Sequence, residues 1–369
     1  MAEFRLPHPD LPPPASTVGA LGWMRRNLFS SPLNIALTGL AAYLLWVAIP
    51  LLLNWALFDA TWSGDDREVC QSNSGACWVF IRVHFDQFIY GFYPEAQRWR
   101  VNIALLLLIL GAAPLFIHTV PNPIKVKLGL GLLVAYPVIA FVLFRGGLLG
   151  LPEVETSRWG GLLLTLVIAG VGMTAALPLG VLLALGRRST MPAIQTLCVT
   201  FIEFWRGVPL ITVLFMSSVM LPLFLPEGMN FDKLLRALVG VTLFQAAYMA
   251  EVVRGGLQAI PKGQIEAAAA LGLGYWKAMA LIVLPQALKL VIPGIVNTFI
   301  ALFKDTSLVL IIGLFDLMNT VHNATTNPAW LGFSTEGYVF AAAVYWLFCF
   351  SMSRYSQSLE KRLHTGHKR

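Results

Sequence analysis

Long apolar runs separated by shorter polar segments dominate the chain. A helix needs about 20 mostly apolar residues to cross the hydrocarbon core of a bilayer. The runs are continuously apolar and do not alternate with polar residues, which favours helices over a β-barrel. The pattern therefore predicts an all-α polytopic membrane protein with about eight transmembrane helices. The expected spans are Leu33–Leu57, Val101–Thr119, Leu128–Phe144, Trp159–Leu185, Val208–Phe224, Leu234–Val253, Ala280–Phe303 and Tyr338–Met352.

Two polar connections between the expected spans are long. The loop 59–100 is rich in aromatic residues and contains Cys70 and Cys77. An exported loop sits in an oxidising space, so we expect a disulfide between them, and the alternative is two unpaired thiols on a mobile loop. The connection 304–338 contains one apolar piece, Leu308–Phe315, which is too short to cross a bilayer. We expect it to form a re-entrant or outer-surface helix.

Composition supports lipid as the main solvent of this chain. Of its 369 residues, 57% are hydrophobic and 12% are charged, against about 25% charged in ordinary soluble domains. Lys and Arg concentrate in the segments that are cytoplasmic when the N-terminus is placed inside, and most acidic residues fall outside. The positive-inside rule then predicts that both termini are cytoplasmic. The net charge of +7 is explained by this asymmetry, so no nucleic-acid partner is expected.

This topology divides the chain into four parts. We expect a cytoplasmic N-terminal segment at 1–32, without the features of a cleavable signal peptide, and three further helices at 33–147. A core follows at 148–353, with a cytoplasmic loop at 254–279. A basic cytoplasmic tail occupies 354–369.

The loop between the sixth and seventh expected spans contains the most specific pattern. It reads Glu266-Ala267-Ala268, three residues, Gly272, nine residues, and Ile282-Val-Leu284-Pro285. Residues 266–271 are strong helix formers, whereas Gly272 and Gly274 allow the chain to turn. The residues predict a short helix, a sharp bend and a second helix that leads into the membrane.

This loop is similar to the EAA signature of ABC importer permeases. Three further stretches resemble the polar-amino-acid permeases of the histidine/glutamine type, although Val208 stands where Thr is usual. These are Phe204-Trp-Arg206-Gly207-Val-Pro209-Leu210, Ala246-Ala247-Tyr248-Met-Ala250-Glu251 and Phe303-Lys304-Asp305-Thr306-Ser307-Leu308. The first three spans, with Cys77-Trp78 and Gly91-Phe-Tyr93-Pro94, resemble the M subunit of general L-amino-acid importers, with the glutamate and glutamine systems as close alternatives.

The resemblance implies a type I ABC importer permease core in the last five spans, located in the bacterial inner membrane. It implies that L-amino acids cross by alternating access, with a periplasmic binding protein outside and a second permease subunit, Q-type, beside this chain. A homodimer is also compatible with the sequence. ATP and Mg would be bound by a partner ATPase dimer, so this chain is expected to hold no cofactor or metal and to be no enzyme. The coupling helix that docks on the ATPase would comprise Glu266, Ala267, Ala268, Gly272, Leu273 and Gly274.

Polar residues near the spans are candidates for the substrate path. Lys304 and Asp305 place opposite charges side by side, which suits the carboxylate and ammonium of an amino acid, and Thr306 and Ser307 add hydroxyls. The alternative is that Lys304 and Asp305 cap helices at the water interface. Gln245 and Asn297 either line the path or join helices by hydrogen bonds.

Another pair of charges lies beside a predicted helix break. Glu203 and Arg206 are one helical turn apart, so they can form an ion pair, and Gly207 and Pro209 follow. These four residues are candidates for a gate, and a purely structural pair is equally compatible with the sequence.

Two other function classes fit the sequence less well. A secondary transporter driven by an ion gradient usually contains inverted repeats, and none is evident. A membrane enzyme would need a catalytic constellation, and neither His nor Ser residues are arranged for one.

Overall fold

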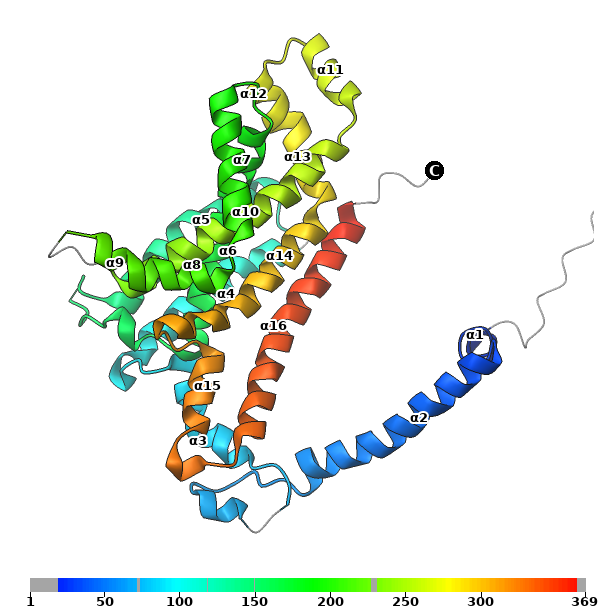
Figure 1. Cartoon of the computed structure of the whole chain (residues 1–369), viewed down its shortest axis with the longest axis vertical. Helices are drawn as coiled ribbons and strands as arrows, with labels where there is room; N and C mark the ends of the chain where they lie inside the picture. The colour runs from blue at the N-terminus through cyan, green and yellow to red at the C-terminus, as the bar shows by residue number, and fades with distance from the viewer. Residues whose placement is uncertain (1–18, 72–73, 118, 149, 227–230, 364–369) are drawn as a thin grey trace, which may run out of the picture. The chain divides into compact units, whose positions relative to one another are not determined.

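The computed structural model describes residues 19–71, 74–117, 119–148, 150–226 and 231–363 (Figure 1). Residues 1–18 of the expected N-terminal segment and 364–369 of the basic tail lie outside the described residues. Within the described ranges every regular element is a helix, which confirms the all-α prediction. The chain divides into two compact units, Met1–Val79 and Phe80–Arg369, which are described separately.

The first unit contains α1 (Gly19–Asn27) and the long apolar helix α2 (Pro32–Leu53). Pro32 occupies the first helical turn of α2, and the Ser31 side chain caps it by accepting a hydrogen bond from the Asn34 amide at 3.2 Å. The helix continues in a π-helical turn, η1 (Asn54–Phe58). No side chain of α2 is buried within the protein, so its apolar surface suits contact with lipid.

The loop after α2 is closed by a disulfide between Cys70 and Cys77, with the short η2 (Arg67–Cys70) between α2 and the bond. The Trp78 indole packs against Trp55 and Trp62 and donates a hydrogen bond to the Ala56 carbonyl at 2.8 Å. The disulfide and the aromatic contacts together hold this loop against the end of the first expected span.

The remaining helices belong to the second unit, except for the first two residues of α3. In chain order these are α3 (Trp78–Tyr90), η3 (Glu95–Gln97), α4 (Arg98–Phe116), α5 (Asn122–Arg145), η4 (Thr156–Arg158), α6 (Gly161–Arg187), α7 (Pro192–Gly207), α8 (Leu210–Phe215), η5 (Met216–Met220), α9 (Leu221–Phe224), α10 (Lys233–Ala259), α11 (Lys262–Ala270), α12 (Tyr275–Ala278), η6 (Met279–Val283), α13 (Leu284–Leu290), α14 (Ile292–Asp305), η7 (Thr306–Ile312), α15 (Leu317–Thr325), η8 (Pro328–Trp330) and α16 (Ser334–Leu363).

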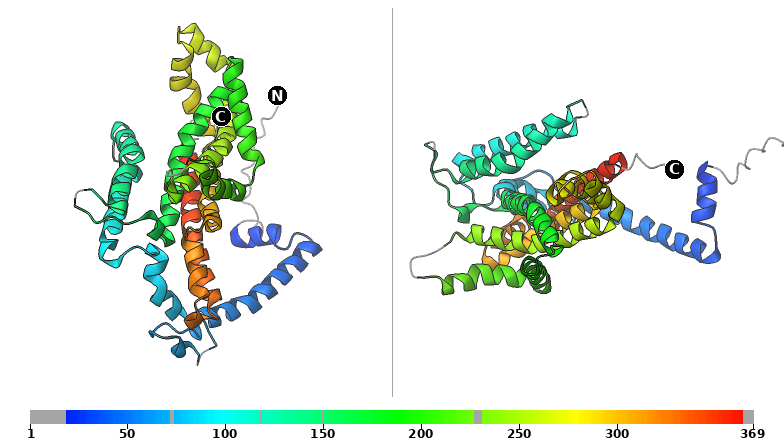
Figure 2. Two further views of the ribbon diagram at one scale, coloured as in Figure 1. Left: turned by 60° about the vertical axis from the view of Figure 1, so that its left-hand side comes forward. Right: turned by 90° about the horizontal axis from the view of Figure 1, so that it is seen from above.

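Helix α10 is the central element of this unit (Figures 1 and 2). It packs against α6, α7, α8, α13 and α14. Its N-terminal half contributes Leu234, Val241 and Phe244 to one apolar core, and its C-terminal half contributes Met249 and Val253 to a second. One helix therefore joins the two cores of the unit.

Close contact between α6 and α10 depends on a small residue. A Cβ atom at Gly180 would lie 2.7 Å from the Met249 side chain and 3.0 Å from the Ala250 backbone. Small residues let helix backbones approach closely, which is the main source of packing energy where lipid removes the hydrophobic driving force.

The helices α4 and α5 are tied together at one end by two buried side chains. Tyr93 donates a hydrogen bond to the Phe144 carbonyl at 2.8 Å. Arg100 is fully buried and donates to the Pro152 carbonyl at 3.0 Å and to the Gln97 side chain. These bonds satisfy carbonyl groups at and beyond the C-terminal end of α5, where helical partners end.

The described residues contain six helices long and apolar enough to cross a membrane, or seven if one bent pair is a single span. The bent pair is α7 with the segment 210–224, and the two parts meet at 101°. We expected a single span at Val208–Phe224, whereas the structure adds α7 before it and a sharp turn at Pro209. The cause is local, because Val208, directly before a proline, adopts an extended conformation that ends α7.

The last two expected spans also differ in their boundaries. The structure breaks the expected span Ala280–Phe303 at Val291 and continues α14 through η7 as one apolar stretch, Ile292–Ile312. Most of Leu308–Phe315, expected as a separate helix, belongs to this stretch. Helix α16 is longer than the expected Tyr338–Met352, and it is not one of the six apolar helices given above.

Candidate functional site

The loop after α10 has the helix–bend–helix structure that its residues predict. Helix α11 ends in a left-handed turn at Gly272, whose φ is +73°. The Gly272 amide donates to the Ala269 carbonyl at 2.9 Å, and the Leu273 amide donates to the Ala268 carbonyl at 3.1 Å. These two bonds form a Schellman motif, which ends α11 and turns the chain into α12 at Gly274.

One side of this loop faces away from the protein. Ala268 is buried, whereas Glu266 and Ala267 are exposed, and Leu271 is 77% exposed. The Trp276 side chain is also exposed, at 71%. The loop thus presents the exposed apolar side chains of Leu271 and Trp276 beside the Glu266 carboxylate, at the far end of the second unit (Figure 1).

The inner side of the loop is less tightly packed. A pocket of about 270 Å³ separates α11 from α12 and η6. A hydrogen bond from Gln286 to the Gln264 side chain, 3.2 Å long, connects α11 to α13, and Gln286 also donates to the Ile282 carbonyl. The pocket is lined by Arg188, Ile265, Ala269, Leu273, Tyr275, Ala278, Met279 and Val283.

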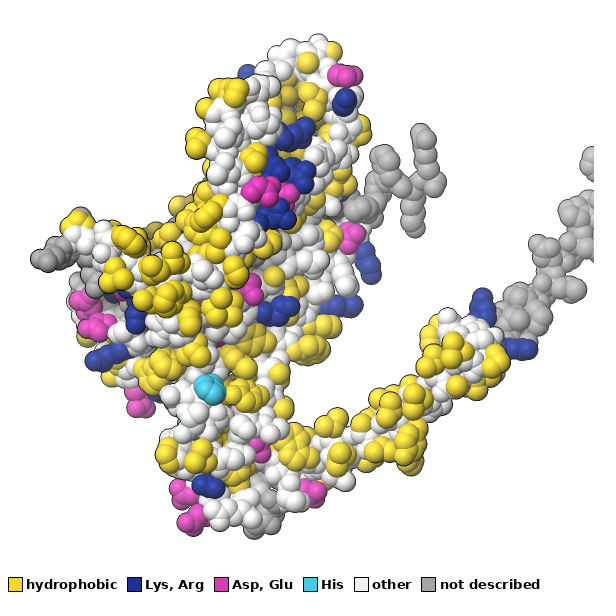
Figure 3. All heavy atoms as spheres, in the orientation of Figure 1, with side chains coloured by type: hydrophobic (Ala, Val, Ile, Leu, Met, Phe, Trp, Pro, Cys, Tyr) yellow, Lys and Arg dark blue, Asp and Glu magenta, His cyan; other side chains and the backbone are white. Residues whose placement is uncertain are grey.

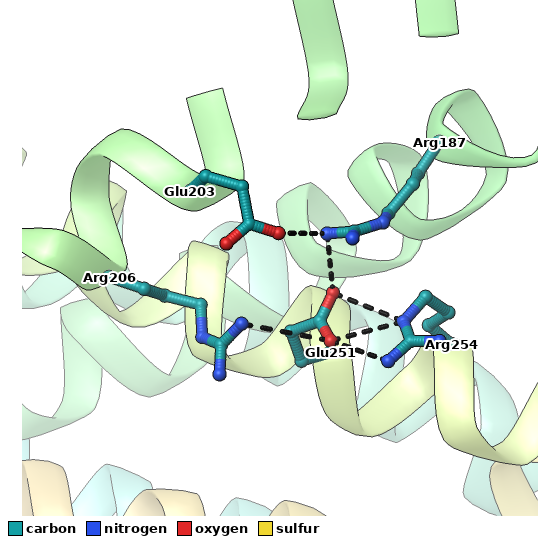
Figure 4. A network of polar contacts seen from close by, with 5 residues as sticks. All are labelled: Arg187, Glu203, Arg206, Glu251 and Arg254. Atoms are coloured by element: carbon teal, nitrogen blue, oxygen red, sulfur yellow. Dashed lines mark hydrogen bonds and ion pairs between the residues drawn. The ribbon is translucent and has the colours of Figure 1, made fainter. Parts of the chain in front are cut away.

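Five charged side chains form a cluster between α6, α7 and α10 (Figure 4). Arg187 donates to Glu203 at 2.8 Å and to Glu251 at 2.9 Å. Arg254 binds the other Glu251 oxygen at 2.8 Å, and Arg206 lies 3.7 Å from it. Glu251 therefore contacts three guanidinium groups, and its side chain is only 17% exposed. Figure 3 shows this mixed basic and acidic patch within an otherwise hydrophobic face near α7 and α10.

The sequence placed Glu203 and Arg206 together, but each binds a different partner. Glu203 contacts Arg187 of α6, and Arg206 contacts Glu251 of α10 and stacks over Tyr248, 5.6 Å from the ring centre. Both belong to the cluster, and the turn at Gly207 and Pro209 directly follows them. Sequence reasoning missed Arg187, Glu251 and Arg254 as members. An acidic residue inside an apolar span, as Glu251 is, was the available signal.

The stretch Lys304–Ser307 lies within the apolar segment 292–312 and not at the end of a span. Lys304 is exposed, Asp305 is half-buried and Thr306 is 1% exposed. The Thr306 hydroxyl donates to the Phe303 carbonyl at 2.8 Å, and the Ser307 hydroxyl donates to the Lys304 carbonyl at 3.0 Å. Both hydroxyls thus cap the end of α14, where it changes into the 3-10 helix η7.

The two mid-span amides occupy different environments. Gln245 is buried in α10 and donates to the Thr298 carbonyl of α14 at 2.6 Å. Asn297 of α14 is exposed. Gln245 therefore joins two helices in this structure, and Asn297 presents its amide at the surface of the second unit.

Comparisons with known proteins identify the family. The family described as "Binding-protein-dependent transport system inner membrane component" matches residues 176–365. The chain belongs to this family. The matched region contains the helix–bend–helix loop, the charged cluster and Lys304–Ser307.

Known relatives match the chain over different lengths. The inner membrane amino-acid ABC transporter permease protein YhdY of Escherichia coli (strain K12) is 61% identical and covers 99% of both chains. The glutamate/glutamine/aspartate/asparagine transport system permease protein BztC of Rhodobacter capsulatus is 43% identical, over 97% of this chain and 96% of its own. The glutamate/aspartate import permease protein GltK of Escherichia coli O157:H7 is 33% identical and covers 55% of this chain and 91% of its own. The chain is thus an integral inner-membrane permease of this transport family, and the matches to YhdY and BztC extend over its N-terminal helices.

Proposed function

We propose that this permease forms the translocation path of an ATP-driven importer for L-amino acids of the general or glutamate/glutamine type. The single observation that carries the proposal is the 61% identity over 99% of the chain to an amino-acid ABC transporter permease. The name of the 43% identical relative supports acidic amino acids and their amides as substrates.

In this proposal the energy comes from two partner ATPase subunits that bind ATP and Mg. Helix α11 is the coupling helix, and its exposed face docks on an ATPase, with Glu266 offering a carboxylate to a basic or backbone donor there. The exposed Leu271 and the small Ala267 suit close contact with a complementary groove. The Schellman turn at Gly272 and the Gln264–Gln286 bond support this role, because they transmit movement of α11 to the membrane helices.

The proposal includes an orientation and further partners. Both termini and the coupling loop lie in the cytoplasm, as the positive charges indicate. The loop 59–100 then lies in the periplasm, where a disulfide between Cys70 and Cys77 is stable, and an amino-acid-binding protein docks on that side. A second, Q-type permease subunit completes the path, and this chain contributes the segments 148–353.

Substrate passage in this proposal uses two groups of residues. Lys304, Asp305 and Ser307 contact the amino acid, with Asn297 on a neighbouring position of the path. Thr306 and Gln245 are buried and hydrogen-bonded to the Phe303 and Thr298 carbonyls, so they hold the helices that carry these residues. The charged cluster, with the turn at Gly207 and Pro209, serves as a gate. Its ion pairs exchange partners as the path switches between its outward-facing and inward-facing states. The ion pairs of Glu203 and Arg206 with different helices support this role, since relative movement of α7 and α10 would exchange them.

The test is ATP hydrolysis and uptake by the complex reconstituted in liposomes, with and without binding protein loaded with L-glutamate or L-glutamine. We expect stimulation in the parent complex and its loss in two variants. Glu266→Arg reverses the charge of the docking surface. Gly272→Pro fixes φ near −65°, which the left-handed turn cannot use.

Gly170→Ala is the control, because a side chain at this position of α6 meets open space. It should keep both the uptake and the stimulated ATP hydrolysis. Uptake that requires only an ion gradient and no ATPase would contradict the proposal and indicate a secondary transporter instead.

A further inference from the structure

The carboxylate of Asp316 is fully buried and is surrounded by neutral hydrogen-bond donors. Its side chain caps α15 by accepting from the Met318 and Asn319 amides at 3.3 and 3.1 Å. It also accepts from the Tyr345 hydroxyl of α16 at 2.8 Å and from the side-chain amide of Asn319. A buried carboxylate is costly unless such donors satisfy it, so this arrangement constrains the groups around it.

Two of these donors also hold the proposed substrate segment. The Asn319 side-chain amide donates its second hydrogen bond to the Ser307 carbonyl at 2.8 Å. The Tyr345 hydroxyl lies 3.4 Å from the Thr306 hydroxyl, and the rings of Tyr345 and Phe303 are 5.4 Å apart. Because Thr306 and Ser307 begin a 3-10 helix, whose internal hydrogen bonds have poorer geometry, bonds from outside the helix matter more here.

The same corner is fixed to α6 through the backbone. The Leu317 amide donates to the Thr165 hydroxyl at 3.0 Å, and the Gly161 amide donates to the Phe315 carbonyl at 2.9 Å. Asp316 therefore lies where α6, η7, α15 and α16 meet. Thr306 and Ser307 are therefore held by contacts that involve the helices α6, α15 and α16.

We propose that Asp316, Asn319 and Tyr345 are positioning residues, which hold the turn at Thr306 and Ser307 and thereby keep the substrate-contacting side chains in the geometry that binds the amino acid. This inference rests on the proposed function, in which Lys304, Asp305 and Ser307 contact the substrate. The three side chains act through Thr306 and Ser307 without contacting the substrate themselves. Burial raises the pKa of the Asp316 carboxyl, and the bonds from Tyr345 and Asn319 oppose that effect.

Equilibrium binding of radiolabelled L-glutamate and L-glutamine to the purified permease–ATPase complex, without binding protein, tests the inference. Tyr345→Phe removes only the hydroxyl, and Asp316→Asn keeps a residue that caps helices well. We expect the Kd to rise by about three- to tenfold in each variant, the effect of losing one hydrogen bond of ordinary strength. Basal ATP hydrolysis and the yield of folded complex should stay at the parent level.

Tyr338→Phe is the matched control on the same pair of helices. Its hydroxyl forms an exposed hydrogen bond with His322 at 2.9 Å, away from Asp316, so its removal should leave the Kd unchanged. An unchanged Kd in Tyr345→Phe, or equal shifts in both tyrosine variants, overturns the positioning role. A fall in folded yield with the Kd unchanged overturns it as well, because it indicates a purely structural contact.

The two proposals fail in distinguishable ways. A parent complex that takes up neither amino acid with ATP and binding protein contradicts the proposed function. A parent complex that takes them up but binds neither directly contradicts the substrate role of Lys304, Asp305 and Ser307, and with it this inference. Normal uptake and binding with insensitive Asp316 and Tyr345 variants contradict the positioning role alone.

Discussion

At the scale of single residues, Glu251 stands out because its charge is balanced from several helices. Its carboxylate contacts Arg187 of α6, Arg206 of α7 and Arg254 of its own helix. Removing one member of a buried ionic network costs more than the network itself contributes, because the remaining charges lose their partner in a poorly solvated place. The guanidinium groups around Glu251 make its loss especially unfavourable.

Glu251→Gln should therefore destabilise the permease by about 3 kcal/mol and abolish ATP-driven uptake. The variant keeps the size of the side chain and removes only its charge. The measurement is the temperature at which the detergent-solubilised complex loses its monodisperse elution, together with uptake in liposomes.

Glu203→Gln provides the comparison within the same cluster. The Glu203 side chain is 54% exposed and contacts Arg187 alone, so its neutralisation should cost about 0–1 kcal/mol after screening by water. Equal losses of thermal stability in the two variants would show that burial of Glu251 does not dominate the cluster.

At the scale of elements, the sequence predicts those helices and bends that are determined by residues close together in the chain. The helix, bend and second helix of residues 262–278 follow from helix formers and two glycines, and the structure confirms them. The all-α architecture follows from long apolar runs. The helix break at Gly207 and Pro209 was also predicted from local residues, and α7 ends there. Hydropathy cannot detect the break at Val291, because apolar residues flank it on both sides.

Contacts between distant residues were also beyond prediction from one sequence. Arg187 and Glu251 are separated by 64 positions, and Asp316 and Tyr345 by 29, with nothing local to indicate their pairing. The candidates Glu203 and Arg206 were found through their charge in an apolar context, but their partners come from other helices. Lys304–Ser307 was found by residue type, whereas its supporting residues were not.

The contact between α6 and α10 gives a prediction at this scale. Gly180→Val should destabilise the second unit by about 1–3 kcal/mol, because the new side chain would overlap Met249 and the backbone of Ala250. The loss should appear as a lower melting temperature and a lower yield of folded permease.

Gly170→Val separates this clash from the general effect of a β-branched residue in a helix. Gly170 lies on the same helix, and a Cβ atom added there would meet no atom within 4 Å. Its melting temperature should therefore stay close to that of the parent. A similar decrease in both variants would mean that close approach at Gly180 is not what holds α6 against α10.

At the scale of the whole molecule, the distribution of charge and the disulfide support the same orientation of the chain in the membrane. Basic residues concentrate on the side of the coupling loop, and the cysteines of loop 59–100 lie on the opposite side in the proposed orientation. The inner membrane separates a reducing cytoplasm from an oxidising periplasm, so the oxidised state of Cys70 and Cys77 and the positive-inside rule depend on the same assignment of sides.

Thiol labelling tests this assignment in a background carrying Cys198→Ser and Cys349→Ser. With the remaining cysteines joined, a membrane-impermeant maleimide should not react in spheroplasts until a reductant is added. Adding Cys77→Ser frees the thiol of Cys70, which should then react in spheroplasts but not in sealed inside-out vesicles. Gly263→Cys, with Cys70 and Cys77 both replaced by Ser, places a thiol at an exposed position of α11 and should show the reverse pattern. Labelling of both thiols from the same side would contradict the proposed topology, and with it a cytoplasmic coupling helix opposite a periplasmic docking loop.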